Sequence, residues 1–583
     1  MDIRAKQFFA LILILVLTLL FSGRLFYLQV IRGEEYANLS VRNFLRTILV
    51  QAPRGNIVSR EGTILAHDIL TYVIKVTPAD IKDEDKIIEL LISTLGVTRE
   101  DVLKAINDEL LPYYYPRIVA VDIPLDKVLE LKIKEKEFPG LSVEMSPLRK
   151  YEKAESFAHA IGYVDEISKE ELFRLFHRGY TSGDRIGKTG VEKQYEEYLR
   201  GIKGKQVFKV DVLGKERFLQ SEKLPEKGNN LVLTLSDELQ LKVSDIIKDL
   251  PGAAILMNPK NGEILAFVSN PNYNPNYFVR GLGQAIWNLW MQGRALVNRA
   301  ISGQYPPGST FKALVAIAGL ESGMFTDRTV VNCRGFLTVG GRVFRCWTYP
   351  RGHGAVDMRE AIAVSCNVYF YTLGAEVGIN KIVEYAENLG FGKPTGIDLP
   401  NELQGLFPNP QWKREKIKER WYAGDTANLS IGQGYLLATP LQMASFYSFI
   451  ANGGYRVNPH IVKSVRNNQG EEIYRAYFPP LFQDVPLNTI KVIKEGLRRA
   501  VTHGGGLSPL RELPIEVAAK TGTAQTARNE RPHLWLVAYA PANDPEVVAV
   551  ILSESSRYDL ANRLAPYMRR VLEAWIEYKN RGN

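Results

Sequence analysis

The sequence predicts an α+β protein with three parts: an N-terminal membrane-spanning helix, a mixed α/β pedestal, and a C-terminal domain built on a five-stranded antiparallel sheet flanked by helices. The five strand-like runs lie at residues 253–257, 263–268, 515–519, 534–539 and 547–552. The first two flank Pro259-Lys260-Asn261-Gly262, which is a hairpin signal. Helical sequence separates them from the last three, so one antiparallel sheet built from both ends of the domain is the simplest solution. A last helix is expected from about 561 to 578.

The length of 583 residues makes a single core implausible, and about two to four domains are expected. The net charge of +9 is spread over the whole chain, which is typical of a solvated, mildly basic surface rather than of a patch for anionic lipids or polymers. Nothing in the sequence indicates nucleic-acid binding.

The N-terminus carries an apolar run long enough to cross a bilayer. Arg4 and Lys6 precede residues 8–23, which hold no charge, and apolar residues resume after Arg24 up to Val30. A cleavable signal peptide is the alternative, but no small-residue cleavage site follows the run. We therefore predict a cytoplasmic tail at 1–7 and a single transmembrane anchor at 8–30, with the rest of the chain exported.

Residues 40–225 mix short strands with helical stretches and contain no catalytic constellation, so we predict a membrane-proximal pedestal domain. Residues 73–76 and 118–121 are strand-like, whereas 169–177 and 192–199 are helical in pattern. A polar, proline- and glycine-containing stretch at 225–230 indicates a boundary, and the C-terminal domain is placed at 226–583.

Three short motifs in this domain supply the parts of an acyl-transfer site. They are Ser309-Thr310-Phe311-Lys312, Ser365-Cys366-Asn367 and Lys520-Thr521-Gly522-Thr523. The first offers a serine nucleophile with a lysine one helical turn away, the second a hydroxyl and an amide, and the third a cation and backbone donors on a strand. A Ser-x-x-Lys pair alone is a weak signal, but the ordered set is strong.

The local context of Ser309 supports this interpretation. Tyr305-Pro306-Pro307-Gly308 cannot propagate a helix, and apolar residues recur at helical spacing after Ser309 until Glu321-Ser322-Gly323. Ser309 and Lys312 then share a face, and Ser309 lies where free N–H groups favour negative charge.

The chain resembles the class B penicillin-binding proteins, most closely the elongation-type penicillin-binding protein 2 group. The resemblance runs almost end to end. It rests on the segments Tyr305–Lys312, Lys520–Gln525, Trp421–Thr426, Ser430–Gly434, Thr439–Gln442, Pro53–Ile57, Phe138–Leu141 and Gly187–Lys193. Trp347 followed by His353-Gly354, and Cys366 inside the second motif, favour the elongation type over the division type.

The resemblance implies a penicillin-recognising transpeptidase fold and a peptidoglycan D,D-transpeptidase of the bacterial cytoplasmic (inner) membrane that acts in elongation and rod-shape maintenance. Its substrates would be stem peptides ending in D-Ala-D-Ala, and β-lactam antibiotics would inhibit it covalently. Complex formation with a RodA-type glycosyltransferase and other elongation proteins is implied as well. The chemistry itself requires no cofactor.

Each motif residue then has an expected role. Ser309 attacks the peptide carbonyl, and Lys312 must be neutral to take its proton, which requires a pKa about 3 units below the usual 10.4. Ser365 relays a proton and Asn367 orients the substrate amide. The family's oxyanion hole corresponds to the backbone N–H groups of Ser309 and Thr523. The remaining substrate-binding candidates are Lys520, Thr521, Gly522 and Thr523, of which Lys520 with Thr521 or Thr523 would hold the terminal carboxylate.

Two further residues leave alternatives open. Asp425 could be a carboxylate beside Lys520 that biases its charge and supports the loop, or ordinary turn chemistry in Gly-Asp-Thr. His533 has no evident partner, and a packed or surface histidine is the simpler interpretation.

The three cysteines, Cys333, Cys346 and Cys366, pose a separate question. Together with His353 they could complete a closed structural zinc site that pins the Ser365–Asn367 loop. A Cys333–Cys346 disulfide with Cys366 buried is the alternative in an exported protein, and free thiols are a third. The spacing is wider than in zinc fingers, so it gives weak support by itself.

Other functions share part of this pattern. A β-lactam-hydrolysing enzyme has the same three motifs but needs neither an anchor nor a pedestal, and a membrane β-lactam sensor would carry several spanning segments. A non-catalytic scaffold would not need every catalytic side chain. The transpeptidase is therefore preferred.

Overall fold

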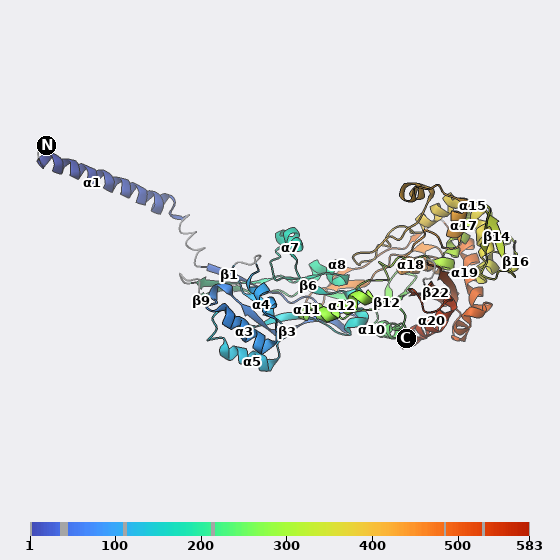
Figure 1. Ribbon diagram of the computed structural model, residues 1–583, viewed down its shortest axis with the longest axis horizontal. Coiled ribbons are helices and arrows are strands. Elements are labelled where there is room, and N and C mark those ends of the chain that lie inside the picture. Colours follow the sequence, from blue (N-terminus) through green and yellow to red (C-terminus); the bar gives the residue numbers. More distant parts are fainter. Residues whose placement is uncertain are drawn as a thin grey trace.

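The computed structural model describes residues 3–34, 45–108, 113–210, 216–482, 485–526 and 531–581. Figure 1 shows the pedestal and the C-terminal domain as the two ends of one elongated body. Helix α1 (Ile3–Phe26) continues into a π-helical turn, η1 (Tyr27–Ile31). Residues Gln7–Ile31 form a helix long and apolar enough to cross a membrane, and its apolar window is not buried against the protein. This helix coincides with the predicted anchor at 8–30.

The pedestal has the expected mixture of strands and helices. Strand-like residues 73–76 end β3, residues 118–121 overlap β4, and the helical pattern at 169–177 falls on α7 and η3. The pedestal elements are β1 (Leu45–Val50), β2 (Ile57–Val58), β3 (Ile64–Val76), η2 (Pro78–Asp80), α3 (Glu84–Leu95), α4 (Arg99–Ile106), β4 (Arg117–Ala120), α5 (Leu125–Lys134), β5 (Leu141–Tyr151), α6 (Ala154–Ile161), β6 (Val164–Glu166), α7 (Lys169–Leu175), η3 (Phe176–Arg178), β7 (Arg185–Gly187), α8 (Gly190–Gln194), α9 (Glu196–Leu199), β8 (Gly204–Val210) and β9 (Glu216–Lys223).

A buried ion network joins two of the pedestal motifs. The Arg54 guanidinium donates to Glu192 at 2.7 Å and to Glu196 at 2.8 Å, and Arg149 donates to Glu192 at 2.7 Å and to Asp68 at 3.2 Å. Removing Arg54 would leave the buried Glu196 carboxylate without its ion pair, and breaking a buried pair in this way costs about 3–5 kcal/mol. The network therefore fixes the segment after β1 against α8 and α9.

The C-terminal domain contains the predicted five-stranded sheet. Its elements are β10 (Asn230–Leu233), α10 (Asp237–Ile246), β11 (Gly252–Met257), β12 (Ile264–Asn270), α11 (Asn276–Arg280), α12 (Gln284–Gly293), η4 (Gly308–Phe311), α13 (Lys312–Glu321), β13 (Val331–Cys333), β14 (Phe336–Val339), β15 (Arg342–Arg345), β16 (Gly354–Val356), α14 (Met358–Ala363), α15 (Asn367–Asn388), α16 (Pro410–Trp412), η5 (Lys413–Ile417), α17 (Ala423–Ser430), α18 (Pro440–Ala451), β17 (Tyr455–Arg456), β18 (Val462–Arg466), β19 (Glu472–Arg475), β20 (Leu481–Phe482), α19 (Leu487–Thr502), η6 (Gly505–Glu512), β21 (Ala518–Ala524), β22 (His533–Ala540), β23 (Val547–Ser553), η7 (Ala561–Leu564) and α20 (Ala565–Arg581).

The sheet has the order β12-β11-β23-β22-β21, with every neighbouring pair antiparallel. Both faces are buried: Ile255 and Val537 lie in the core that contains α13 and α18, whereas Ala254 and Leu536 lie in the core that contains α10 and α20. Strand β21 begins at Ala518, three residues later than expected from the alternation at 515–519. The pairing register would place Pro541 opposite Glu516, and proline has no N–H to extend the ladder.

A second sheet ties the pedestal to the C-terminal domain. Its order is β19-β18-β10-β2-β3-β4, and β5 pairs with β3. Strand β10 runs parallel to β2, so Ile57 and Leu231 are fully buried in one shared core. The Tyr195 hydroxyl also donates to Asp398 at 2.8 Å across the two parts. The pedestal and the C-terminal domain thus contribute strands to one sheet.

Candidate active site

Ser309 lies on a tight turn that leads directly into α13. The turn, η4, is a 3₁₀-helix, and Lys312 is the first residue of the α-helix. The expected helix N-terminus at Ser309 is thus a 3₁₀ turn that starts one residue earlier, because Pro307 precedes it with a preset backbone angle. Ser309 is half-buried, whereas Lys312 is fully buried.

Glycines allow this turn to pack against two neighbouring segments. Gly308 has φ +56° and donates its N–H to the Gly432 carbonyl at 2.8 Å. A Cβ on Gly432 would lie 2.1 Å from the Gly308 carbonyl oxygen, and a Cβ on Gly522 would lie 2.6 Å from that of Pro307. The close approach of three backbones therefore requires glycine at these positions. The indole of Trp535 adds a hydrogen bond to the Pro306 carbonyl at 2.9 Å.

The second motif brings its hydroxyl and amide to Lys312. The Lys312 ammonium donates to the Ser365 carbonyl at 2.8 Å, to Ser365 Oγ at 3.2 Å and to Asn367 Oδ1 at 2.6 Å. Ser365 itself has φ +56°, a left-handed conformation that costs a non-glycine residue about 1 kcal/mol or more. The hydroxyl is thus held in place by a strained backbone between α14 and α15.

Lys520 reaches the same hydroxyl from the sheet. Its ammonium donates to Ser365 Oγ at 2.9 Å and to the Thr521 carbonyl at 3.1 Å, and its side chain is buried. Burial lowers the pKa of Lys312 to about 8. Burial, and then the charge of Lys312, holds the pKa of Lys520 well below its usual range. A buried pair of ammonium groups around one hydroxyl is an arrangement suited to proton transfer.

The third motif lies on the edge strand β21, beside the turn η4 that carries Ser309, which we call the nucleophile turn after the expected role of Ser309. A Cβ on Gly308 would lie 3.0–3.3 Å from the backbone atoms of Thr523. The Gln433 side chain donates to the Thr523 carbonyl at 3.2 Å, and the Thr523 hydroxyl accepts from the Ala561 N–H at 3.3 Å. Among the described residues, the hydrogen bonds of the Lys312 ammonium go to Ser365 and Asn367 and not to Ser309.

Asp425 forms an ion pair with Lys413 and not with Lys520, the cation expected from the sequence. Its carboxylate accepts from Lys413 Nζ at 2.7 Å and from the Tyr422 N–H at 2.8 Å. Lys413 is buried, and its amine also lies over the rings of Tyr422 and Tyr435. The carboxylate therefore fixes the segment before α17 through Lys413 rather than through Lys520.

Several residues that support the site were not predicted from the sequence. Besides Lys413 and Trp535, the Tyr447 hydroxyl donates to the Thr310 carbonyl at 2.9 Å from α18. No local pattern distinguishes these residues from ordinary core and surface positions. The rings of His533 and Tyr305 pack in a T-shaped arrangement with their centroids 5.0 Å apart, and His533 Nδ1 accepts a hydrogen bond from the Ser555 N–H at 3.0 Å. These contacts agree with the interpretation of His533 as a packed histidine.

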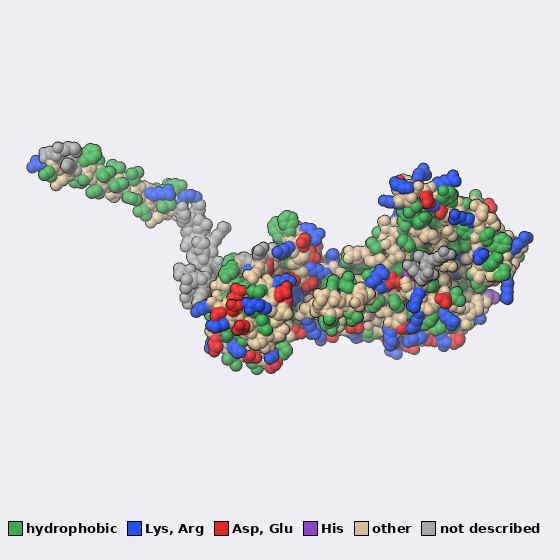
Figure 2. All heavy atoms as spheres, viewed as in Figure 1, with side chains coloured by type: hydrophobic (Ala, Val, Ile, Leu, Met, Phe, Trp, Pro, Cys, Tyr) green, Lys and Arg blue, Asp and Glu red, His purple; other side chains and the backbone are tan. Residues whose placement is uncertain are grey.

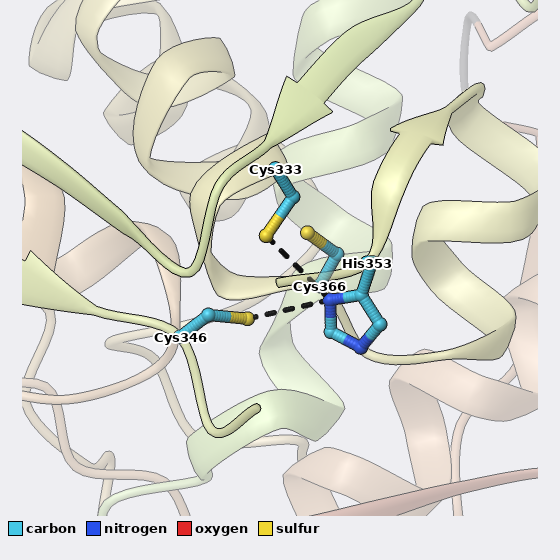
Figure 3. A group of neighbouring side chains, drawn as sticks. All are labelled: Cys333, Cys346, His353 and Cys366. Carbon is cyan, nitrogen blue, oxygen red and sulfur yellow. Dashed lines mark hydrogen bonds between the residues drawn. The ribbon is translucent and has the colours of Figure 1, made fainter. Parts of the chain in front are cut away.

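The three cysteines and His353 converge beside the second motif (Figure 3). The possible ligand atoms all lie within 4.8 Å of one another, and His353 Nδ1 lies 3.7 Å from Cys333 Sγ and 3.5 Å from Cys346 Sγ. Tetrahedral zinc with Zn–S of about 2.3 Å and Zn–N of about 2.0–2.1 Å separates ligand atoms by roughly 3.5–3.8 Å. All three cysteines are free and buried. The donor set and spacing therefore fit a closed zinc site.

This cluster also contacts the second motif directly. Cys346 Sγ accepts a hydrogen bond from the Asn367 N–H at 3.3 Å, and Cys366 Sγ accepts from Tyr369 N–H at 3.5 Å. The Trp347 indole donates to the Val364 carbonyl at 3.1 Å. The position of the Cys/His cluster is therefore coupled to the positions of Ser365 and Asn367.

The five-stranded sheet, the serine–lysine turn and the hydroxyl between two lysines define a serine-type, penicillin-recognising transpeptidase domain. Comparison with known proteins agrees: residues 252–573 match the family described as penicillin binding protein transpeptidase domain, and residues 49–233 match the penicillin-binding protein dimerisation domain. The chain belongs to the penicillin-binding proteins, in the elongation-type group typified by penicillin-binding protein 2.

Its relatives include the peptidoglycan D,D-transpeptidase MrdA of Acinetobacter baumannii, which is 33% identical over 98% of this chain and 88% of the relative. The complex between penicillin-binding protein 2 and MreC from Helicobacter pylori contains a similar chain, with a TM-score of 0.82 and 30% identity over 92% of this chain and 99% of that one. A peptidoglycan synthase complex that coordinates polymerization and crosslinking contains another, with a TM-score of 0.69 and 31% identity over 97% and 98%.

Proposed function

We propose that this chain is a peptidoglycan D,D-transpeptidase that cross-links stem peptides during cell elongation, with Ser309 as its nucleophile. The observation that carries the proposal is the position of Ser365 Oγ, 3.2 Å from the Lys312 ammonium and 2.9 Å from that of Lys520. Such a set moves a proton from the attacking serine to the departing amine. The family and the relatives named above supply the substrate class.

The reaction has two acyl transfers. Ser309 Oγ attacks the carbonyl of the penultimate D-alanine while neutral Lys312 takes its proton. Ser365 passes a proton to the departing amine, the C–N bond breaks, free D-alanine leaves, and the peptide remains as an ester on Ser309. The amine of a second stem peptide then attacks the ester, the proton returns to Ser309 Oγ, and a new peptide bond forms. β-Lactams acylate the same oxygen.

The groups that bind the substrate come from the turn η4, strand β21 and the start of α15. The backbone N–H groups of Ser309 and Thr523 form the oxyanion hole, a role supported by the 3.0–3.3 Å approach of the Gly308 Cβ position to Thr523. One such donor contributes about 2.7–4 kcal/mol to transition-state stabilisation. Lys520 with Thr521 or Thr523 holds the terminal carboxylate; the Thr523 hydroxyl accepts from the Ala561 N–H and keeps its own proton to donate. Asn367 orients the substrate amide, and Asp425 supports the loop.

The test is the intact mass of the exported part after incubation with a labelled penicillin, with Ser309→Ala beside it. A slowly decaying adduct of one penicilloyl group that is absent from Ser309→Ala is expected. Rapid turnover without an adduct would indicate a hydrolase instead. A folded protein without either signal would contradict the assignment of Ser309.

We further propose that Cys333, Cys346, His353 and Cys366 hold one structural zinc ion. The ion would fix the β13–β16 segment against the Ser365–Asn367 loop without entering the reaction. We expect about one zinc per purified chain, with loss of thermal stability when a chelator removes it. Less than roughly 0.2 zinc per chain, together with a disulfide in the same preparation, would overturn the proposal.

We also propose how the whole chain is placed in the cell. Residues 1–7 stay in the cytoplasm, the 8–30 helix is the single membrane anchor, and the pedestal (40–225) and transpeptidase domain (226–583) lie outside the bacterial inner membrane. Arg4 and Lys6 before the apolar run support this orientation. A RodA-type glycosyltransferase and an MreC-type protein are the proposed partners, supported by the complexes of similar chains. Protease added outside spheroplasts should digest the bulk of the chain.

A further inference from the structure

The loop after α17 reaches the third motif through one side chain, that of Gln433. Its Nε2 donates to the Thr523 carbonyl at 3.2 Å, and the residue is half-buried. Among the described residues, no other hydrogen bond joins residues 431–435 to β21. The same loop touches the nucleophile turn, because the Gly308 N–H donates to the Gly432 carbonyl at 2.8 Å. Gln433 therefore completes a bridge from the nucleophile turn to the edge strand.

This hydrogen bond indicates which way the backbone of Thr523 faces. Strand β21 pairs with β22 on one side only, and Gln433 meets the Thr523 carbonyl on the other, open side. In an antiparallel strand the N–H and the carbonyl of one residue point to the same side. The Thr523 N–H thus faces the open side as well. Its nitrogen lies 3.3 Å from the position of a Cβ on Gly308, which places it toward the nucleophile turn.

Thr523 lies near the end of its strand, where the pairing with β22 stops. The last pair of the ladder is Ala524 with His533, and β21 ends at Ala524. The ends of elements open more readily than their centres, so contacts outside the ladder decide how firmly Thr523 is held. Gln433 binds its carbonyl, and the Ala561 N–H of η7 binds its hydroxyl at 3.3 Å.

Gln433 is itself fixed by the last turn of α17. Its N–H donates to the Asn428 carbonyl at 3.0 Å, and the Gly432 N–H donates to the Leu429 carbonyl at 2.8 Å. Glutamine suits this position because its amide can donate to a carbonyl, whereas an ionised carboxylate can only accept. Its side chain is also one methylene longer than that of asparagine. Both the donor and its reach are therefore needed to meet the Thr523 carbonyl.

We propose that Gln433 is a positioning residue for the oxyanion hole, acting through the Thr523 carbonyl to fix the direction of the Thr523 N–H. The proposal rests on the transpeptidase function and adds a residue to that same site. Gln433 does not touch the reacting atoms. An oxyanion donor is effective because it already points to the place where charge develops, so loss of Gln433 should weaken the transition state more than the initial complex.

The test is acylation of the full-length chain in detergent by a labelled penicillin. The main variant is Gln433→Met, which keeps a side chain of similar length and removes the donor. Figure 2 shows many Lys and Arg side chains on the C-terminal domain, so an uncharged substitution leaves the field met by the ligand unchanged. Gln433→Asn is the second variant and keeps the amide without its reach. The control, Gln411→Met, removes an exposed glutamine that donates to Glu415 at 2.8 Å.

Two readouts separate positioning from general support of the fold. The dependence of the rate on penicillin concentration gives the dissociation constant of the initial complex and the first-order rate of acylation separately. The infrared stretch of the ester carbonyl in the adduct, measured with isotope-labelled penicillin, reports the hydrogen bonds that this carbonyl oxygen accepts. Thermal unfolding identifies the variants that are folded, and Gln433→Asn carries the same readouts if Gln433→Met is not.

Both Gln433 variants should acylate roughly tenfold more slowly or worse, with an unchanged dissociation constant of the initial complex. Their ester carbonyl stretch should move to higher frequency, because weaker hydrogen bonding strengthens the C=O bond. The control should match the wild type in every readout.

Acylation within about twofold of the wild-type rate in the folded variants would overturn the proposal. Slower acylation with an unchanged carbonyl stretch would overturn it too, since Gln433 would then support the loop and not the donor. Failure of the transpeptidase function gives a different result: the wild type itself would form no adduct, and the proposal would fall with that function.

Discussion

Ser365 combines two unusual features of the candidate site, the contacts of its hydroxyl and the conformation of its backbone. Its hydroxyl accepts hydrogen bonds from two buried ammonium groups while its backbone occupies the left-handed region. Strain of this kind persists only where the surroundings over-determine a conformation, and here two helices and a lysine do so. In the proposed mechanism the serine supplies its hydroxyl oxygen, and the backbone conformation places that oxygen between the two lysines.

Substitution of Ser365 separates these two properties. Ser365→Ala and Ser365→Gly both remove the hydroxyl, and we expect each to slow penicillin acylation by at least about 100-fold. Only glycine relieves the positive φ, so Ser365→Gly should be more stable than Ser365→Ala by about 1 kcal/mol. Denaturant unfolding and adduct formation measure the two effects. Equal stability of the variants would show that the strain has no cost.

The pH dependence of acylation should report Lys312. Burial lowers the pKa of Lys312 to about 8, and only the neutral amine can accept the serine proton. The neutral fraction therefore rises about tenfold per pH unit below pH 8 and levels off above it. The second-order rate of acylation by a labelled penicillin, measured from pH 6 to pH 9.5, should follow this curve. A rate independent of pH across this range would exclude Lys312 as the base.

At the scale of elements, the position of Ser309 depends on close backbone-to-backbone packing between three segments. The nucleophile turn, the edge strand β21 and the loop after α17 approach so closely that glycine is required at three positions. Gly432 is the sharpest case, because a Cβ there would lie 2.1 Å from the Gly308 carbonyl oxygen.

Gly432→Ala should therefore disrupt the turn that carries Ser309. We expect a loss of about 2 kcal/mol or more in the free energy of unfolding and at least a tenfold slower acylation. Gly434→Ala is the matched control: its φ of +81° is similarly strained, but the nearest neighbour of its Cβ would be at 3.6 Å. If the two variants behave alike, backbone strain rather than the close approach controls this loop.

At the scale of the whole molecule, the shared sheet makes the pedestal part of the folding unit of the catalytic domain. Strand β10 pairs with β2 on one side and with β18 on the other, and their apolar residues occupy a single core. An isolated 226–583 fragment would expose that core and leave β10 without β2.

We accordingly expect the exported part, from residue 45 onward, to unfold in one cooperative transition. The 226–583 fragment should have a lower melting temperature or fail to fold, because it loses the buried contacts of Ile57 with Leu231. Differential scanning calorimetry on both proteins checks this. Two well-separated transitions in the longer protein, or an equally stable fragment, would show that the domains are independent.

The sequence by itself determined the long apolar N-terminal helix, the five strands of the catalytic sheet and the three motifs, because each depends on a short stretch of sequence: an apolar run, a period-two pattern, or residue types at fixed spacing. Only the tertiary structure decided that Asp425 pairs with Lys413, that β2 and β10 join the two domains, and that three cysteines and His353 meet beside Ser365. These contacts join residues that are far apart in the sequence, and they depend on strand register and on how the loops close. A local sequence pattern does not indicate which distant segment will pack against it.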